Sequence, residues 1–230
     1  MKDFVCDLRL LTCAGLVRQG AVLADIGTDH AYLPIFLLKN NLISAAVLSD
    51  VNEGPLTSAR QNAEECGVMD RCTIVLADGA SALVGMGITD YAICGMGGEL
   101  IARIIVDAPH LRERGIRLIL QPMSRPEVLR RTLSSLGFEI LDERYSSADG
   151  KFYLTILAEF ADVEEKTDPV WRFLGDFNPL NDKENQLGYL SRRLCALEHS
   201  LQGKRLGGVA AYEEELLIPH IKQRISALQK

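Results

Sequence analysis

The chain has 230 residues, of which 47% are hydrophobic and 24% charged, and its formal net charge is −6. This composition is typical of a globular protein and argues against a disordered or fibrous chain. The negative charge argues against a protein that bulk charge alone holds to nucleic acid, although it leaves room for a local basic face. No stretch approaches the roughly 20 uninterrupted apolar residues that span a bilayer.

The N-terminal residues and the cysteines indicate the cellular compartment of the protein. Asp3, Asp7 and Arg9 stand where a secretory signal needs an apolar run, so we do not expect export. The six cysteines include no C-x-x-C pair, which disfavours zinc-ribbon and thioredoxin-like functions. We therefore expect a cytoplasmic protein with reduced thiols, no membrane segment and no metal.

From Gly20 to about Ala158, short apolar runs alternate with amphipathic stretches. The runs predict strands at Val22–Ile26, Ala45–Ser49, Cys72–Leu76, Tyr91–Cys94, Arg117–Leu120, Phe138–Leu141 and Phe152–Leu157. The amphipathic patterns predict helices at Leu33–Asn40, Pro55–Cys66, Glu99–Ala108 and Pro126–Leu136. Strands that alternate with helices at this spacing predict βαβ units, and hence a parallel sheet covered on both faces.

The last two predicted strands differ from the others in their connection. Only Asp142–Lys151 lies between them, which is too short for a helical crossover but suits a hairpin. Ala148-Asp-Gly150 supplies the turn residues. The sheet should therefore be mostly parallel with one antiparallel strand near its end, which disfavours an NAD-type Rossmann sheet.

After Phe160 the pattern changes, and we predict a division into residues 1–160 and a helical domain of residues 161–230. Five leucines recur at steps of three and four and indicate one apolar helix face; they are Leu187, Leu190, Leu194, Leu197 and Leu201. Gly203 and Gly207-Gly208 should end this helix, and a second begins at about Val209. Two such helices predict an antiparallel, coiled-coil-like hairpin. Pro219 should kink or restart the second helix.

Candidate binding residues follow the predicted strands. In an open α/β sheet, ligands bind at the carboxyl ends of the strands, near the point where strand order reverses. Three successive strands end in an acid and the fourth ends in a glycine turn. The residues concerned are Asp25, Gly27, Thr28, Asp29 and His30 after the first strand, Asp50, Val51 and Asn52 after the second, Asp78 and Gly79 after the third, and Gly95, Met96 and Gly97 after the fourth.

These residue types suit a nucleoside that carries an amino-acid tail and no phosphate. Gly27 allows close backbone approach, Asp50 lies at the distance usual for an acid that accepts both ribose hydroxyls, and Asp78 can accept from an adenine amine. The chain has neither G-x-G-x-x-G nor G-x-x-x-x-G-K-[ST]. Asp25 and Asp29 would repel a pyrophosphate but attract an ammonium. We infer S-adenosyl-L-methionine as the ligand.

Four segments together resemble one family, the bacterial tRNA (adenine-22-N1)-methyltransferases (TrmK). They are Ala24–Pro34, Ile93–Gly98, Leu118–Pro122 and Asp149–Tyr153. The resemblance runs from about Arg9 to Glu159, and Met123 departs from it where a polar residue is expected. It implies a class I methyltransferase fold, with a Rossmann-like, mostly parallel sheet, S-adenosyl-L-methionine as methyl donor, and N1 of adenine 22 in tRNA as the methylated atom.

Site residues follow from the strand ends and the resemblance together. We expect the cofactor to be bound by Asp25, Gly27, Thr28, His30, Asp50, Val51, Asn52, Asp78, Gly79, Gly95 and Met96. Asp29 is the candidate catalytic residue, because a carboxylate near the reacting methyl group would stabilise the developing positive charge on the base. Each of three neighbours also has a structural interpretation: Asp29 as a helix cap, His30 as a packing residue, and Tyr32 as a ring buried beneath its helix.

Binding of the tRNA phosphates depends on basic residues. An aromatic side chain can stack on a base that has left the helix. The candidate substrate-binding residues are Arg9, Tyr32, Gly97, Gln121, Arg125, Arg192 and Arg193. A run of arginines, among them Arg103, Arg112, Arg114, Arg117, Arg130 and Arg131, together with Lys204-Arg205, indicates a basic rim. Most single arginines of such a set are ordinary solvated charges.

Three alternatives stay open. The chain could be a methyltransferase for a small molecule or a protein, in which case the helical hairpin is a lid or a dimerisation element. It could also be a non-catalytic nucleoside-binding protein. An NAD-dependent dehydrogenase is opposed by the missing glycines and by the acids beside the phosphate position. We expect a monomer or weak dimer.

Overall fold

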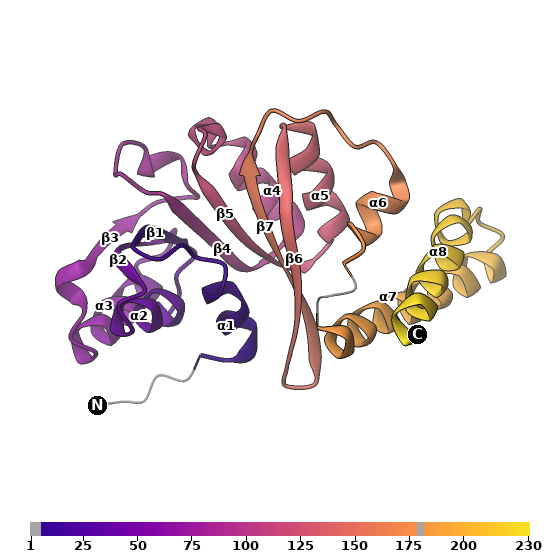
Figure 1. Ribbon diagram of the computed structural model, residues 1–230, viewed down its shortest axis with the longest axis horizontal. Coiled ribbons are helices and arrows are strands. Elements are labelled where there is room, and N and C mark those ends of the chain that lie inside the picture. Colours follow the sequence, from indigo (N-terminus) through magenta and orange to yellow (C-terminus); the bar gives the residue numbers. More distant parts are fainter. Residues whose placement is uncertain (1–5, 179–181) are drawn as a thin grey trace.

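A computed structural model describes residues 6–178 and 182–230 (Figure 1). Its centre is a seven-stranded sheet with the order β3-β2-β1-β4-β5-β7-β6. The strands are β1 (Ala21–Ile26), β2 (Ile43–Asp50), β3 (Cys72–Leu76), β4 (Asp90–Gly97), β5 (Arg117–Ser124), β6 (Phe138–Ala148) and β7 (Lys151–Phe160). All seven predicted strands are confirmed, and β2, β4, β5 and especially β6 extend beyond their predicted ends.

The first five strands are parallel, and β7 lies antiparallel between β5 and β6. The predicted hairpin turn is confirmed, because Asp149 and Gly150 both have positive φ (49° and 69°), as a two-residue type I′ turn requires. The pairing of β6 with β7 continues to Ala148 and Lys151, well past the last pair of β7 with β5. The hairpin therefore projects beyond the sheet as a two-stranded ribbon (Figure 1).

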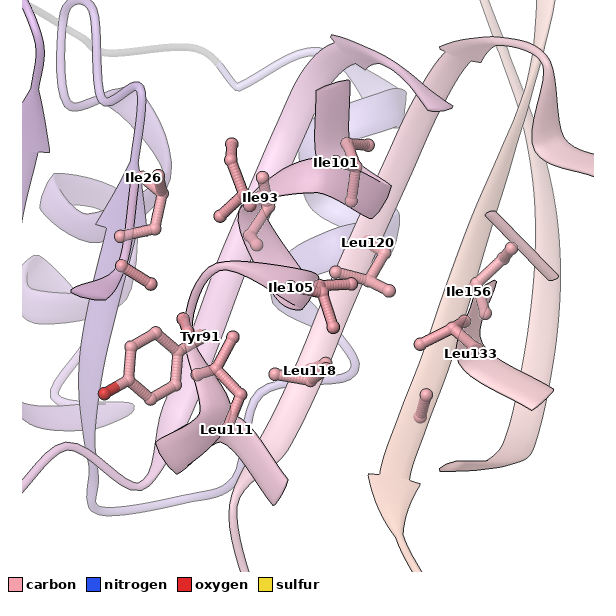
Figure 2. Close-up of a cluster of buried hydrophobic side chains, with 14 of the residues drawn as sticks. Ile26, Tyr91, Ile93, Ile101, Ile105, Leu111, Leu118, Leu120, Leu133 and Ile156 are labelled. Atoms are coloured by element: carbon pink, nitrogen blue, oxygen red, sulfur yellow. The ribbon is translucent and has the colours of Figure 1, made fainter. Parts of the chain in front are cut away.

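Helices cover both faces of the sheet, as the alternation predicts. One apolar cluster joins the sheet to α1 (Leu8–Ala14), α2 (Tyr32–Lys39) and α3 (Glu53–Glu65). The other joins it to α4 (Gly98–Val106) and α5 (Pro126–Ser135). Figure 2 shows part of the second cluster, in which Ile101, Ile105 and Leu133 of these helices lie against strand residues such as Leu120. Three short 3₁₀ segments complete this part: η1 (Met69–Arg71), η2 (Ser81–Leu83) and η3 (Pro109–Arg112).

The C-terminal residues form α6 (Pro169–Leu174), α7 (Lys183–Leu206) and α8 (Tyr212–Gln229). The helical hairpin is confirmed, since α7 and α8 pack against each other through the predicted apolar positions. The predicted end of the first helix at Gly207-Gly208 is confirmed, since α7 ends at Leu206 with Gly207 as its C-cap, whereas Gly203 does not break the helix. Pro219 does not restart the second helix, because it lies inside one continuous α8. The short α6, which the sequence analysis missed, begins with Asp168 accepting from the amides of Val170 and Trp171.

Arginines attach the C-terminal helices to the sheet domain. Arg130 of α5 is buried, pairs with Glu143 of β6 (2.6 Å), and donates to the carbonyl of Phe173 in α6 (2.9 Å). Arg193 of α7 pairs with Glu127 of α5 at 3.0 Å. Figure 1 shows α7 beginning beside β6 and β7 and extending away from the sheet with α8.

Among the described residues, the structure has no helix long and apolar enough to cross a membrane.

Candidate functional site

A cleft of about 600 Å³ opens at the carboxyl ends of the strands. It lies where the strand order reverses between β1 and β4, which is the expected ligand position in an open α/β sheet. Every residue predicted to bind the cofactor lines this cleft, and so does Asp29. The strand-end pattern therefore brings residues from four separate segments to one place.

The turn after β1 forms the floor of the cleft. The amides of Gly27 and Thr28 both donate to the carbonyl of Ser49 at the end of β2 (2.8 and 3.0 Å). Gly27 has a φ of 71°, and a Cβ at this position would lie 2.1 Å from the terminal methyl of Met96. The positive φ favours glycine here, and a Cβ would also displace the flexible end of the Met96 side chain.

Asp25 is a buried carboxyl at the base of the cleft. Its side chain is 6% exposed and accepts a hydrogen bond from the Thr28 hydroxyl at 2.7 Å. Burial raises the pKa of Asp25 to about 6, against the lowering effect of the Thr28 bond, and the nearby Asp50 raises it further. A bound cation would offset this burial cost and favour the ionised form.

The acids of β2 and β3 lie at one side of the floor. Asp50 is half-buried and accepts from the amide of Asn52 at 2.9 Å, which fixes the turn that begins α3. Asp78 is exposed beside Gly79, whose φ is 72°. Two carboxylates on neighbouring strand ends can accept from a sugar and from an amine of one elongated ligand.

The segment after the floor carries Asp29, His30 and Tyr32, and all three line the cleft. The helix-cap interpretation of Asp29 is wrong, because α2 begins at Ala31 without a side-chain cap and the Asp29 side chain is 70% exposed. Nε2 of His30 lies 3.5 Å from an Asp29 carboxylate oxygen. The His30 ring stacks on Tyr32, with centroids 5.2 Å apart. Tyr32 is itself 41% exposed, so its interpretation as a buried ring is wrong too.

Arg9 enters the cleft from α1 on the other side of the switch point. Its Nη1 donates to Oε1 of Gln121 (2.9 Å), and the same oxygen accepts from the amide of Gly95 (3.1 Å). Gln121 is fully buried and does not line the cleft. It fixes Arg9 and Gly95 from below, which differs from the direct substrate contact that we expected.

The remaining expected substrate residues lie outside the cleft. Gly97 precedes α4, and Arg125 precedes α5 and pairs with Glu127 at 3.1 Å. Arg192 donates to the carbonyl of Gly150 at 2.8 Å, on the turn of the β6–β7 ribbon. Arg193 is 18% exposed, is held by Glu127, and stacks 3.8 Å from the Phe173 ring.

The predicted basic rim is wrong for two of its members. Arg130 is 1% exposed and paired with Glu143, and Arg117 pairs with Glu159 at 2.8 Å. Both arginines therefore hold elements of the protein together. A run of arginines in the sequence does not distinguish such internal pairs from a surface that meets a nucleic acid.

The clearest cleft residues without a predicted role are Asp7, Leu100 and Tyr153. Arg103 also lines the cleft, although it was predicted only as part of the basic rim, and Met123 lies beside the floor next to Gln121 and Pro122. Tyr153 ends the Asp149–Tyr153 segment of the family resemblance, and Met123 directly follows its Leu118–Pro122 segment. Both positions thus stood out in the sequence without a predicted binding role. Asp7 is two residues before Arg9. Within residues 6–178 and 182–230, no group of three or more His, Cys, Asp or Glu side chains is arranged to hold a metal ion.

Comparison with known proteins agrees with this geometry. A family model described as a methyltransferase domain matches residues 6–156. The tRNA (adenine(22)-N(1))-methyltransferase of Bacillus subtilis is 31% identical over 201 residues, which cover 87% of this chain and 84% of that protein. The crystal structure of the B. subtilis m1A22 tRNA methyltransferase TrmK has a TM-score of 0.77 at 26% identity, with 99% and 98% of the two chains covered.

A Streptococcus pneumoniae protein, named as a candidate tRNA (m1A22) methyltransferase, was solved in complex with S-adenosyl-L-methionine. It has a TM-score of 0.82 and 32% identity, with 96% of this chain and all of that chain covered.

The doubly wound sheet, the antiparallel β7 and the acidic cleft at the switch point define a Rossmann-like methyltransferase of class I. Within that class, the chain belongs to the tRNA (adenine(22)-N(1))-methyltransferase family.

Proposed function

We propose that this protein transfers a methyl group from S-adenosyl-L-methionine to N1 of adenine 22 in tRNA. The observation that carries the proposal is the row of carboxylates at successive strand ends around a floor built on Gly27 and Gly95. It suits a nucleoside with an aminoacyl tail, and the relatives named above are tRNA methyltransferases or candidates for that activity.

The residues of the cleft fit the donor in its chemistry. The ribose hydroxyls would be held by Asp50, the adenine amine by Asp78, and the ammonium of the tail by Asp25. Gly27 and Gly95 line the floor without adding a side chain to it. When bound, S-adenosyl-L-methionine supplies a methyl group already activated by a sulfonium, so the protein mainly needs to align it with the base.

The acceptor atom requires little activation. N1 of adenine has a lone pair in the plane of the ring and is largely unprotonated at neutral pH, so no strong general base is needed. The methylated ring is cationic, and Asp29, whose carboxylate faces the cleft, would stabilise this charge as it develops. The base must leave its stack before N1 can react.

We also propose that the chain is divided into two domains with different roles. Residues 1–160 would form the methyltransferase domain, and residues 161–230 a coiled-coil-like helical domain that helps to bind tRNA through Arg192 and neighbouring cations. A cytoplasmic location follows from the proposed tRNA substrate. We propose a reaction without a metal and a monomer or weak dimer, in which α7 and α8 cover each other's apolar faces.

Mass mapping of nucleosides tests the function directly. Unmodified tRNA incubated with the protein and the donor should gain one methyl group, mapped to adenine 22, and a transcript with another base at position 22 should gain none. Methylation at a different position, or of a small molecule or protein instead, would overturn the proposal. Calorimetry with S-adenosylhomocysteine and with NAD tests the cofactor, and only the first should bind.

A further inference from the structure

The cleft has a second wall, on the opposite side of the switch point from the acids of β2 and β3. We call it the α1–β7 wall, and it consists of four side chains that line the cleft: Asp7, Arg9, Met123 and Tyr153. They come from the start of α1, the end of β5 and the first residues of β7. In the sheet order, β5 and β7 lie beyond β4 on the side away from β2 and β3. The cofactor residues proposed above therefore leave this wall unused.

Three side chains hold Arg9 in place, and one of them, Gln121, is buried. Its Nη1 bonds to Gln121, its Nη2 lies 3.6 Å from Oδ2 of Asp7, and its Cζ lies 5.8 Å from the centre of the Tyr153 ring. Gln121 also approaches Met123, with Nε2 at 3.5 Å from the sulfur. Gln121 is thus a positioning residue, which fixes two members of the wall relative to the Gly95 floor.

Asp7 has a structural oxygen and a second oxygen that faces Arg9. Oδ1 accepts from the amide of Leu10 at 2.8 Å and so caps α1. Oδ2 lies on the side of the guanidinium, and the side chain is 40% exposed in the cleft. The Asp7 carboxylate, an acceptor, and the Arg9 guanidinium, a donor, therefore lie side by side within one helical turn, next to the Tyr153 ring.

This arrangement matches one edge of adenine. The Hoogsteen edge presents the N6 amine as a donor beside N7 as an acceptor, whereas guanine presents O6 in place of the amine. A carboxylate accepts from the amine and repels O6. Aromatic rings are common stacking partners of bases that proteins take out of a helix.

Resting on the function proposed above, we propose that the α1–β7 wall is the subsite for the target base. Asp7 accepts from N6, Arg9 donates to N7, and the Tyr153 ring and the Met123 side chain contact the faces of the base. The Watson–Crick edge with N1 is then free to face the floor at Gly95 and Met96, where the cofactor side of the cleft begins.

The same contact favours the reaction. The N1 lone pair forms the bond to the methyl carbon, the carbon–sulfur bond breaks with its electron pair kept by sulfur, and the positive charge passes to the ring without a proton transfer. The N6 amine of the cationic ring is a stronger donor, so its hydrogen bond to Asp7 strengthens as the charge develops. Release of an N6 proton to water can follow.

The test compares two substrates with two proteins. Steady-state kcat/KM is measured for tRNA with adenine at position 22 and for the same tRNA with purine there, which lacks the 6-amino group. The wild type should prefer adenine, and Asp7→Asn should reduce this ratio by about tenfold, the effect of one hydrogen bond to a charged group. Asparagine preserves the α1 cap. The intrinsic effect of the amine on N1 cancels between the two proteins.

Asp168→Asn is the control, because Asp168 also caps a helix, α6, and does not line the cleft. Its adenine-to-purine ratio should equal that of the wild type. Tyr153→Phe, which keeps the ring, is the reference variant for the stacking contact. Tyr153→Leu should lower kcat/KM for tRNA by about tenfold or more, as expected for a lost stacking contact. Both should bind S-adenosylhomocysteine as the wild type does, in calorimetry.

An unchanged ratio in Asp7→Asn, or wild-type activity in Tyr153→Leu, would overturn the subsite while methylation of adenine 22 still stands. If the wild type leaves position 22 unmodified, the proposed function itself falls, and the subsite falls with it. The two failures are thus distinguishable in the same set of assays.

Discussion

The terminal methyl of Met96 occupies the space that a side chain at Gly27 would need, in the floor of the cleft. A Cβ at position 27 would approach the Met96 terminal methyl to 2.1 Å. The two residues come from the ends of β1 and β4, the neighbouring strands between which the strand order reverses. The missing side chain is thus what lets Met96 pack against the backbone at the switch point, beside the expected ligand position.

Replacing Gly27 with alanine should lower the affinity for S-adenosylhomocysteine by about tenfold or more. The positive φ alone costs about 1–2 kcal/mol in a residue with a Cβ, and Met96 must in addition move into the cleft. Gly20→Ala is the control for the backbone cost, since Gly20 has a similar φ (76°) with no atom within 4 Å of its Cβ position. Calorimetric affinities of Gly27→Ala and Gly20→Ala that agree would contradict this account of the floor.

The raised pKa of Asp25 predicts a pH dependence of cofactor binding. The bound ammonium favours the ionised carboxylate, so affinity for S-adenosylhomocysteine should fall as the pH drops through about 6. The decrease should approach tenfold for each pH unit while binding requires the ionised form. Asp25→Asn should bind less tightly at neutral pH and lose this pH dependence. An Asp25→Asn protein that keeps the wild-type profile would assign the titration to another group.

Asp25 should also make the free energy of unfolding pH-dependent, but this contribution decreases as the pH rises, whereas cofactor affinity increases. Without ligand, the folded-state pKa of Asp25 lies above its unfolded value of 3.8, so the folded protein binds the proton more tightly. This contribution to the free energy of unfolding is fully present below pH 3.8 and is lost as the pH rises through about 6. Thermal melting of the wild type and of Asp25→Asn over this range would display the difference.

Asp29→Asn should lower kcat for tRNA methylation by about tenfold, with little change in the affinity for S-adenosylhomocysteine. The effect is smaller than for a buried group because the side chain is 70% exposed and water screens its charge. Asparagine suits the test better than alanine, because the φ of Asp29 is 48°, a region that asparagine tolerates. Asp149→Asn, at a φ of 49° in the β6–β7 turn, is the control for the backbone. Unchanged turnover in Asp29→Asn would remove the catalytic role.

The cofactor side of the cleft was predictable because its signal is local. Each strand is an apolar run, and the acid or glycine that follows it is fixed at the strand end by one or two residues of chain. Parallel strands then bring these ends to one edge of the sheet, so Asp25, Asp50 and Asp78 meet without any further information.

The α1–β7 wall could not be predicted in the same way, because it depends on contacts between distant segments. Arg9 and Gln121 are 112 residues apart, and only the folded sheet shows that the glutamine lies beneath the arginine. Burial is equally invisible in a run of arginines: Arg130 and Arg125 are five residues apart, yet one is 1% exposed and the other 60%. The ribbon extension of β6 also rests on its pairing with β7, which a four-residue apolar run does not indicate.

Arg193 should prove to be a structural residue of the helical domain. It pairs with Glu127 and stacks on Phe173, so Arg193→Glu places two carboxylates together beside α5. We expect a loss of about 1–3 kcal/mol, between the values for exposed and buried pairs, and a melting temperature lower by several degrees. Adding Glu127→Arg should recover part of the loss. A double variant no more stable than Arg193→Glu alone would show that the pair is not what holds α7.

Arg192 is the residue of this helix to test for tRNA binding, because its side chain lies on the surface. Its Nη2 donates to the carbonyl of Gly150, and its Cζ lies 5.7 Å from the Phe152 ring centre, so it stands where α7 meets the β6–β7 ribbon. Arg192→Glu should weaken tRNA binding several-fold and reduce its salt dependence, since a phosphate contact is lost, and the melting temperature should change little. Lys39→Glu, an exposed change at the end of α2, alters the net charge by the same two units and should weaken binding less. Equal affinities of Arg192→Glu and the wild type at low salt would exclude this part of the helical domain from the tRNA-binding surface.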